Sequence, residues 1–213
     1  TLLLNYLNFQ SLIATKAARI RYAAGDRYLS EFGLRRAPSL GGISASRAAI
    51  AGGFDSSSNM FAAKKYDIPA AGTMAHSFIQ SHENELTAFR KFAEAEPHNC
   101  TLLVDTYNTL KSGIPNAVIV AKEMMERGGH LKAVRLDSGD LAYLSKKARK
   151  MLDDAGLKEV KIVVSNQLDE YLIKSLLDQK APIDSFGVGT SLATGQPDAA
   201  LDGVYKLSQI AGM

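Results

Sequence analysis

The chain has 213 residues, 46% of them apolar and 22% charged, a composition that suits one globular domain with a sizeable core. Its 25 Lys and Arg side chains against 22 Asp and Glu leave a net charge of +3, a surplus too small to indicate an extended nucleic-acid surface. No apolar run approaches the roughly 18 residues that a membrane span needs, and the first residues lack the basic region of a signal peptide.

The first element predicted along the chain is a helix over residues 5–24. Its apolar stripe comprises Leu7, Leu12, Ile13, Ala17 and Ile20, whereas Lys16 and Arg19 fall outside that stripe. We therefore divide the chain into a leading helix, residues 1–25, and an α/β domain, residues 26–213. Because there is no initiator methionine, we expect the chain to be a piece of a longer protein.

From residue 26 onward, short β-prone runs alternate with amphipathic helices. The expected strands cover residues 28–32, 53–54, 69–72, 101–104, 133–136, 161–164 and 185–188, with a candidate eighth at 204–207. The clearest helices cover residues 87–95, 117–128, 142–155 and 169–177, the last with Asn166 as its candidate cap. Alternating strands and helices predict a parallel sheet, and seven or eight such units favour an irregular, TIM-like (β/α) barrel over an open doubly wound sheet.

Polar residues gather just after the expected strands, at the face on which a parallel barrel opens. The groups are Glu31 with Arg35 and Arg36, residues 55–59, Thr73 with His76 and Ser77, Asp105 with Thr106 and Asn108, Arg135 with residues 137–140, Ser165 with Asn166, and residues 187–190. Each group alone has an ordinary structural explanation. Seven together predict that distant loops meet around one cavity.

Three of these groups have the chemistry that an anionic ligand needs. The two glycines of residues 187–190 let the backbone approach a phosphate, although an isolated Gly-x-Gly-Thr is more often a plain tight turn. Arg135 and Asp137 place a cation and a carboxylate on one face of a strand end, which suits phosphate, carboxylate or ribose hydroxyls, and equally a satisfied ion pair. His76 is a candidate because histidine changes protonation near neutral pH, but a lone histidine is usually structural.

Other catalytic signatures are missing from the sequence. No His or Cys cluster has zinc-ligand spacing, and there is no Walker loop, dinucleotide fingerprint or nucleophile elbow. Asp137 and Asp140 are too few for an all-protein metal cage, so Mg²⁺ would arrive with a diphosphate. The single cysteine, Cys100, precedes an apolar run and is expected to be a buried thiol in a reducing, cytoplasmic setting.

Taken in order, these segments resemble the motifs of nicotinate phosphoribosyltransferases. They are EFGLRR (31–36), GFDSSSN (53–59), GTMAHSF (72–78), DTY (105–107), VRLDSGD (134–140), VSN (164–166) and GVGTS (187–191), followed by GVYKL (203–207). The similarity runs from about residue 4 to residue 207. Each motif alone is weak, and seven in the right order are specific.

The resemblance implies a type II phosphoribosyltransferase fold, in which an irregular α/β barrel stands beside an N-terminal α/β domain, and a homodimer with a shared active site. The implied reaction joins nicotinate to 5-phosphoribosyl 1-diphosphate, gives nicotinate mononucleotide and diphosphate, and is coupled to ATP hydrolysis in NAD synthesis. We expect the 213 residues to leave out the family's N-terminal domain, which holds the aromatic residue expected to stack on nicotinate, and its C-terminal region.

By motif, His76 is similar to the family's histidine that ATP phosphorylates, and Asp137 is a candidate catalytic carboxylate. Thr73 and Arg135 resemble residues that contact nicotinate, and Gly189 with Thr190 resembles the binder of the 5-phosphate. Supporting substrate contacts are expected from Arg35, Asp55, Ser77, Asp105, Ser165 and Asn166, with Mg²⁺ held through diphosphate near Asp105 and Asp137.

Two other interpretations stay open. A nicotinamide phosphoribosyltransferase would use a similar site on a neutral base, although the segments 55–59 and 73–77 favour nicotinate. A non-catalytic nucleotide-binding or oligomerisation module would bind a ligand without turnover, because fold and function are separable.

Overall fold

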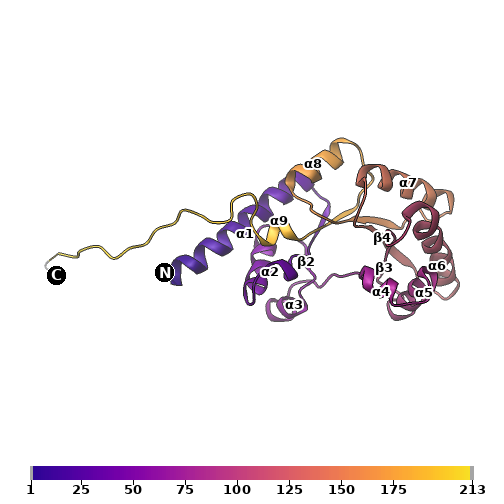
Figure 1. Ribbon diagram of the computed structural model, residues 1–213, viewed down its shortest axis with the longest axis horizontal. Coiled ribbons are helices and arrows are strands. Elements are labelled where there is room, and N and C mark those ends of the chain that lie inside the picture. Colours follow the sequence, from indigo (N-terminus) through magenta and orange to yellow (C-terminus); the bar gives the residue numbers. More distant parts are fainter. Residues whose placement is uncertain (1, 212–213) are drawn as a thin grey trace.

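The computed structural model describes residues 2–211 and shows one parallel β-sheet that curls into a half-barrel, with helices packed along its outer side (Figure 1). The strands are β1 (Tyr28–Glu31), β2 (Ser56–Ser57), β3 (Cys100–Leu103), β4 (Leu131–Leu136), β5 (Lys161–Val164) and β6 (Ser185–Val188). Their order in the sheet is β2-β1-β6-β5-β4-β3. Because β6 pairs with β1, this order follows the chain around a ring, which differs from the order of an open doubly wound sheet.

The ring is not closed within residues 2–211. Past β2, a single bridge joins Ser57 to Ala70, and no further pairing connects this edge to β3. The strand predicted over residues 69–72 is therefore reduced to one bridging residue. The sheet is an α/β half-barrel with six parallel strands.

The helices connect the strands and cover them. They are α1 (Leu2–Ala24), η1 (Leu34–Arg36), α2 (Gly41–Ala51), α3 (Met60–Tyr66), α4 (His76–Gln80), α5 (Glu85–Ala95), η2 (Thr109–Gly113), α6 (Ile114–Glu126), α7 (Leu141–Asp154), α8 (Glu170–Asp178) and α9 (Thr190–Ala193). In Figure 1, α1 runs beside α8 and α2, while α5, α6 and α7 lie at the other end of the sheet. Periodicity did not identify α2, α3, α4 and α9, which are short or rich in small residues.

Alternate strand residues face opposite sides of the sheet, as strand geometry requires. One set is large, apolar and fully buried toward the helices, comprising Leu29, Leu102, Val134, Ile162 and Phe186. Burying each such side chain contributes about 1.5–3 kcal/mol, so this layer holds the fold together. The other set is small or polar and lines a hollow on the inner side, comprising Ser30, Thr101, Ala133, Val163 and Ser185. The core therefore lies outside the curve of the sheet, and the inner side is left to smaller and polar side chains.

The strand predicted at residues 53–54 is wrong, and its displacement matters for the site. Gly52 and Gly53 instead end α2, and Gly53 has a φ of +102°, a conformation that favours glycine. The strand forms three residues later, as β2. Asp55 therefore precedes its strand and lies at the amino end of the sheet, away from the edge where we expected it.

Three further predictions about helices and strands are also wrong. In α1, Leu7 is 55% exposed and Lys16 only 4% exposed, because the start of α8 supplies an ion-pair partner for Lys16 in Glu170. Asn166 does not cap α8, since the carboxylate of Asp169 accepts the amides of Tyr171 and Leu172. No strand forms over residues 204–207, where the described part of the chain offers no strand to pair with.

The expectation that Cys100 is a buried thiol is confirmed. Cys100 is fully buried, and burial raises the pKa of its thiol to about 12, so the thiol stays protonated and unreactive at neutral pH. Among residues 2–211, the structure contains no helix with the length and apolar character of a membrane span.

Candidate active site

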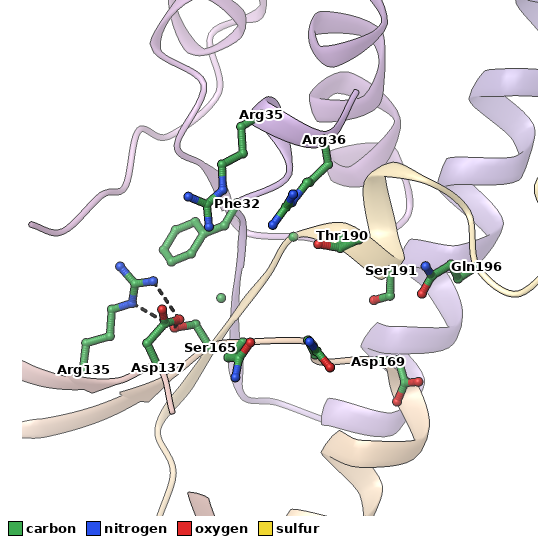
Figure 2. Close-up of a pocket in the computed structure, with 14 residues that line it drawn as sticks. Phe32, Arg35, Arg36, Arg135, Asp137, Ser165, Asp169, Thr190, Ser191 and Gln196 are labelled. Carbon is green, nitrogen blue, oxygen red and sulfur yellow. Dashed lines mark hydrogen bonds and ion pairs between the residues drawn. The ribbon is translucent and has the colours of Figure 1, made fainter. Parts of the chain in front are cut away.

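Two adjoining cavities lie at the carboxyl ends of the strands. The first, of about 610 Å³, is lined by residues that follow β1, β4, β5 and β6 (Figure 2). The second, of about 480 Å³, is lined by the residues around the start of α4. Both cavities share Phe32, Arg35, Arg135 and Asp137, which stand between them. The loops predicted to converge therefore do meet at one edge of the sheet.

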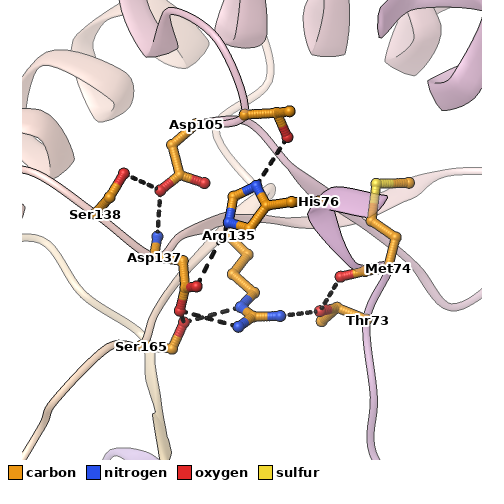
Figure 3. Close-up of polar contacts among 9 residues, drawn as sticks. Thr73, Met74, His76, Asp105, Arg135, Asp137, Ser138 and Ser165 are labelled. Carbon is orange, nitrogen blue, oxygen red and sulfur yellow. Dashed lines mark hydrogen bonds and ion pairs between the residues drawn. The ribbon is translucent and has the colours of Figure 1, made fainter. Parts of the chain in front are cut away.

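His76 and Arg135 lie on either side of Asp137 in one bonded cluster (Figure 3). His76 begins α4, and its Nε2 is 3.5 Å from Asp137 Oδ2 while its Nδ1 is 3.0 Å from the Thr106 hydroxyl. On the other side, Arg135 Nη2 donates to Asp137 Oδ1 at 3.0 Å. With a partner at each ring nitrogen, the imidazole is held in one orientation.

Arg135 comes from β4 and is fixed at four points. Its Nε donates to the Ser165 hydroxyl at 2.9 Å, and its Nη1 donates to the Thr73 hydroxyl at 2.7 Å. Its guanidinium carbon lies 5.4 Å from the centre of the Phe32 ring, within the range of a cation–π contact. Together with the Asp137 pair, these contacts preorganise an arginine that, like Arg35, borders both cavities.

The carboxylate of Asp137 is kept ionised by its surroundings. Burial alone would raise its pKa, but the hydrogen bond from Ser165 and the positive charge of Arg135 outweigh burial, so the pKa lies below its ordinary value. A negative charge is thus fixed at the junction of the two cavities at neutral pH.

Asp105 supports this junction from the end of β3. Its Oδ2 accepts the Asp137 amide at 2.8 Å and the Ser138 hydroxyl at 2.5 Å. Its Oδ1 is buried and has no hydrogen-bond partner, which leaves one carboxylate oxygen available for a cation. Within residues 2–211, no three His, Cys, Asp or Glu side chains are grouped to hold a metal ion. The residues fit a Mg²⁺ ion that brings most of its oxygen ligands with it.

The opposite wall of the first cavity has a different character. Arg35 and Arg36 project from η1, and within residues 2–211 neither guanidinium forms a hydrogen bond or an ion pair. They lie on the same side of the cavity as Thr190 in Figure 2, and η1 contacts α9, the short helix that follows Gly189. Gly187 is required here because a Cβ on it would lie 2.4 Å from the Phe32 ring. Unpaired arginines beside a glycine loop are suited to a phosphate.

The structure places most of the predicted site residues at these cavities. One bonded cluster contains Thr73, His76, Asp105, Arg135, Asp137 and Ser165. The first cavity is lined by Arg35, Asn166, Gly189 and Thr190, and the second by Ser77. Asp55 lines neither cavity, because its carboxylate accepts hydrogen bonds from Arg21 and from the Leu29 amide at the amino end of β1. Its assignment to substrate binding is wrong on geometric grounds.

Several residues of the site were not predicted. Phe32 follows the inward-facing Ser30 by two residues, so strand alternation was the signal that could have placed it at the cavity. Thr106 was noticed only as a neighbour of Asp105. Gln167, Ser191 and Gln196 also line the first cavity, and nothing in the local sequence pattern marks them.

Comparison with known proteins shows which family the chain resembles. Residues 28–211 match the model of the nicotinate phosphoribosyltransferase (NAPRTase) family. The chain is 52% identical, over 99% of its length and 43% of the relative's, to nicotinate phosphoribosyltransferase of Bacillus subtilis. It is 39% identical, over 100% of its length and 44% of the relative's, to the protein of that name from Dictyostelium discoideum.

Two solved structures are similar in fold. Human nicotinic acid phosphoribosyltransferase superposes with a TM-score of 0.80 and 34% identity, over 85% of this chain and 47% of the human chain. A nicotinate-nucleotide pyrophosphorylase from Pyrococcus furiosus superposes with a TM-score of 0.75 and 33% identity, over 88% of this chain and 48% of that one. The chain spans less than half the length of these relatives.

Proposed function

Because the chain belongs to the nicotinate phosphoribosyltransferase family, we propose that the whole protein joins nicotinate to 5-phosphoribosyl 1-diphosphate in the salvage route to NAD. In this reaction the nicotinate ring nitrogen forms a bond to the ribose anomeric carbon. The bond from that carbon to diphosphate breaks, and its electron pair leaves with the diphosphate. One observation carries the proposal: the cluster of His76, Asp137 and Arg135 borders a cavity whose other wall holds two unpaired arginines.

The two walls suggest where each part of the substrates binds. We assign the phosphoribosyl 5-phosphate to Gly189 and Thr190, with Arg35 on the neighbouring η1, because these groups line one side of the first cavity. We assign nicotinate to Thr73 and Arg135, where a guanidinium favours a carboxylate over a neutral carboxamide. This arrangement places the anomeric carbon near the shared wall, at Asp137.

Asp137 then acts on the sugar. As diphosphate leaves, positive charge develops on the anomeric carbon and the ring oxygen. The fixed negative charge of Asp137, held by Ser165 and Arg135, stabilises that charge without reorienting. The remaining contribution to catalysis is positioning. Holding nicotinate and phosphoribosyl diphosphate in line makes their reaction effectively unimolecular.

Mg²⁺ bound with the diphosphate would neutralise charge on the leaving group. Asp105 is the residue of this chain that would hold it, since its Oδ1 has no protein partner. Asp137 is the second candidate ligand, although its oxygens are already engaged by Ser165, Arg135 and His76.

We propose that ATP phosphorylates His76 during turnover. A ring nitrogen of His76 would take the γ-phosphoryl group, with ADP as the leaving group, and water would later release phosphate. The contacts of His76 with Thr106 and Asp137 support this role, because they orient the ring toward the second cavity. A phosphohistidine beside the diphosphate site would change substrate affinity between two states, which couples ATP hydrolysis to transfer.

The whole protein is further proposed to close the barrel and to form a homodimer in the cytoplasm. The ring-like strand order supports closure into a TIM-like barrel of the type II phosphoribosyltransferase kind, beside an N-terminal α/β domain. The exposed side chains of Leu2, Leu3, Tyr6 and Leu7 on α1 support burial of that helix against another part of the assembly. Light scattering on the whole protein should give the mass of a dimer, and a monomer mass would refute the homodimer.

Turnover by the whole protein tests the function. Nicotinate with phosphoribosyl diphosphate should give nicotinate mononucleotide, faster with ATP and Mg²⁺ than without ATP. Nicotinamide in place of nicotinate should be used far more slowly. Equal or better use of nicotinamide would favour a nicotinamide phosphoribosyltransferase. Tight calorimetric binding of phosphoribosyl diphosphate with no product would favour a non-catalytic module.

A further inference from the structure

Glu31 is a buried carboxyl group that belongs to neither cavity. It ends β1, is 1% exposed, and points to the outer side of the sheet, where the other strand residues are apolar. Within residues 2–211 no Lys, Arg or His forms an ion pair with it. A buried carboxyl group without a cation is costly unless hydrogen bonds satisfy it, so its position calls for an explanation.

Hydrogen bonds from three segments meet at this carboxyl group. Its Oε1 accepts the backbone amide of Gly33. Its Oε2 lies 2.8 Å from the Ser46 hydroxyl of α2 and 2.6 Å from the Ser57 hydroxyl of β2. Asn59 braces both serines, donating its backbone amide to Ser57 Oγ and its side-chain amide to Ser46 Oγ. Glu31 thus ties α2 and β2 to the turn that follows β1.

That turn is pressed against the glycine loop of the first cavity. A Cβ on Gly33 would lie 2.5 Å from the Ala193 Cβ and 2.9 Å from the Gly189 carbonyl oxygen. Gly33 also caps the start of η1, the short helix that carries Arg35 and Arg36. Any shift of the Gly33 amide therefore changes the spacing between the two arginines and the Gly189 loop.

We propose that Glu31 is a positioning residue for the arginine wall of the site. By accepting the Gly33 amide, it holds η1 at the spacing from the Gly189 loop that a phosphoribosyl phosphate requires. The inference rests on the proposed function and adds a residue that touches no substrate. Its consequence is selective, because Arg135 on the nicotinate side is held by Ser165, Thr73 and Asp137, none of which forms a hydrogen bond with Glu31.

Steady-state kinetics of the whole protein test this proposal with three variants. Glu31→Met removes the acceptor and keeps an unbranched side chain of similar volume. Because a buried amide then lacks its partner, the KM for phosphoribosyl diphosphate should rise about tenfold, with the KM for nicotinate within about twofold. Glu31→Gln keeps an oxygen for Gly33 and should restore the KM. Glu85→Met removes another buried glutamate, which bonds Asn116 and lines neither cavity, and should leave both KM values unchanged.

A fourth variant keeps the test decisive if Glu31→Met does not fold. Gly33→Ala leaves Glu31 intact but pushes the turn away from Ala193 and the Gly189 carbonyl, and should raise the same KM selectively. Folded Glu31→Met or Gly33→Ala proteins with an unchanged KM for phosphoribosyl diphosphate would overturn the proposal, as would an equal rise in both KM values. If the unmodified whole protein does not transfer the phosphoribosyl group to nicotinate at all, the proposed function is refuted. Failure of the proposed function and failure of the role of Glu31 are therefore distinguishable.

Discussion

The two walls of the first cavity differ in how their charged groups are satisfied. On one wall, Arg135 and Asp137 bond to each other and to Ser165, and His76 of the adjoining second cavity bonds to Asp137 and Thr106. On the other, Arg35 and Arg36 have no hydrogen bond or ion pair within the described chain, and the positions of η1 and its loop are set from behind by Glu31.

This difference separates two ways of building a site. Groups that act in the chemical step must already be oriented when the substrate arrives, which favours a preorganised cluster. Groups that bind an anionic substrate must offer hydrogen-bond donors that the protein does not already use. Arginines whose backbone is fixed and whose guanidinium groups have no protein partner meet this need. In a preorganised cluster, removing one side chain lowers both activity and folding stability. Removing an arginine that is free at its tip lowers substrate affinity and leaves folding stability almost unchanged.

The largest effect is expected for His76→Ala in the whole protein. The preorganised wall would lose the only group on it proposed to accept a phosphoryl group, so ATP should neither label the protein nor stimulate transfer, while slow uncoupled transfer persists. Labelling with γ-phosphate-labelled ATP measures phosphorylation of the protein, and turnover with and without ATP measures the stimulation of transfer. His82→Ala is the control, since His82 bonds to the Phe78 carbonyl and lines neither cavity. Equal ATP stimulation in the His76 variant and the parent would remove His76 from the mechanism.

Arg135→Ala should have the next largest effect, because it removes the guanidinium assigned to the nicotinate carboxylate and leaves the half-buried carboxylate of Asp137 without that cation. Losing charge-assisted hydrogen bonds worth about 3 kcal/mol should lower kcat/KM for nicotinate by about a hundredfold, and losing the pair with Asp137 should lower the melting temperature. Arg135→Lys keeps the charge but loses the fixed contacts with Ser165 and Thr73. Its kcat/KM for nicotinate should lie between those of the parent and Arg135→Ala. An unchanged rate with nicotinate would refute the assigned contact.

Arg35→Ala should have a smaller and different effect, which sharpens the contrast between the walls. Within residues 2–211 the side chain has no hydrogen-bond or ion-pair partner, so its loss should leave the melting temperature unchanged. The KM for phosphoribosyl diphosphate should rise about tenfold, as expected when one charge-assisted hydrogen bond of about 1.5 kcal/mol is lost. A fall in stability comparable to that of Arg135→Ala would show that the two walls are not built differently.

The smallest effect lies outside the site, at Glu85. Burial raises the pKa of Glu85 above its ordinary value, against hydrogen bonds from Asn116 and Ser112. Because the folded protein then binds this proton more tightly than the unfolded chain, stability should decrease as pH rises from near 4.5, the ordinary value, through the raised folded pKa. Glu85→Gln should flatten that part of the pH profile in denaturant titrations. An identical profile in parent and variant would contradict this assignment.

The sequence predicted the fold best where local pattern and tertiary packing agree. The strands and helices from β3 to β6 were anticipated within a few residues, because each apolar run ends in polar or glycine-rich sequence. The segment around Gly52 and Gly53 was misread, since two glycines can end a helix as readily as they can flank a strand. That single error moved Asp55 from the amino end of the sheet into the predicted site.

What the sequence could not show depends on partners far along the chain. From the sequence alone, Lys16 is expected on the exposed face of its helix. It is buried because Glu170, 154 residues later, supplies its counter-charge. Glu31 looked like part of the polar mouth, but the serines that satisfy it lie on α2 and β2, and α2 was not predicted at all. In the bonded cluster, each residue was identified by its motif, while the contact of His76 with Thr106 emerged only from the arrangement of the loops.

A crystal structure of the whole protein with nicotinate mononucleotide bound would test most directly whether these loops serve one substrate. The account predicts the 5-phosphate at the Gly189–Thr190 loop within reach of Arg35, and the pyridine carboxylate at Arg135 and Thr73, with Asp137 beside the ribose. A nucleotide bound away from this cavity, or bound with its phosphate at Arg135 and its ring at Arg35, would contradict it.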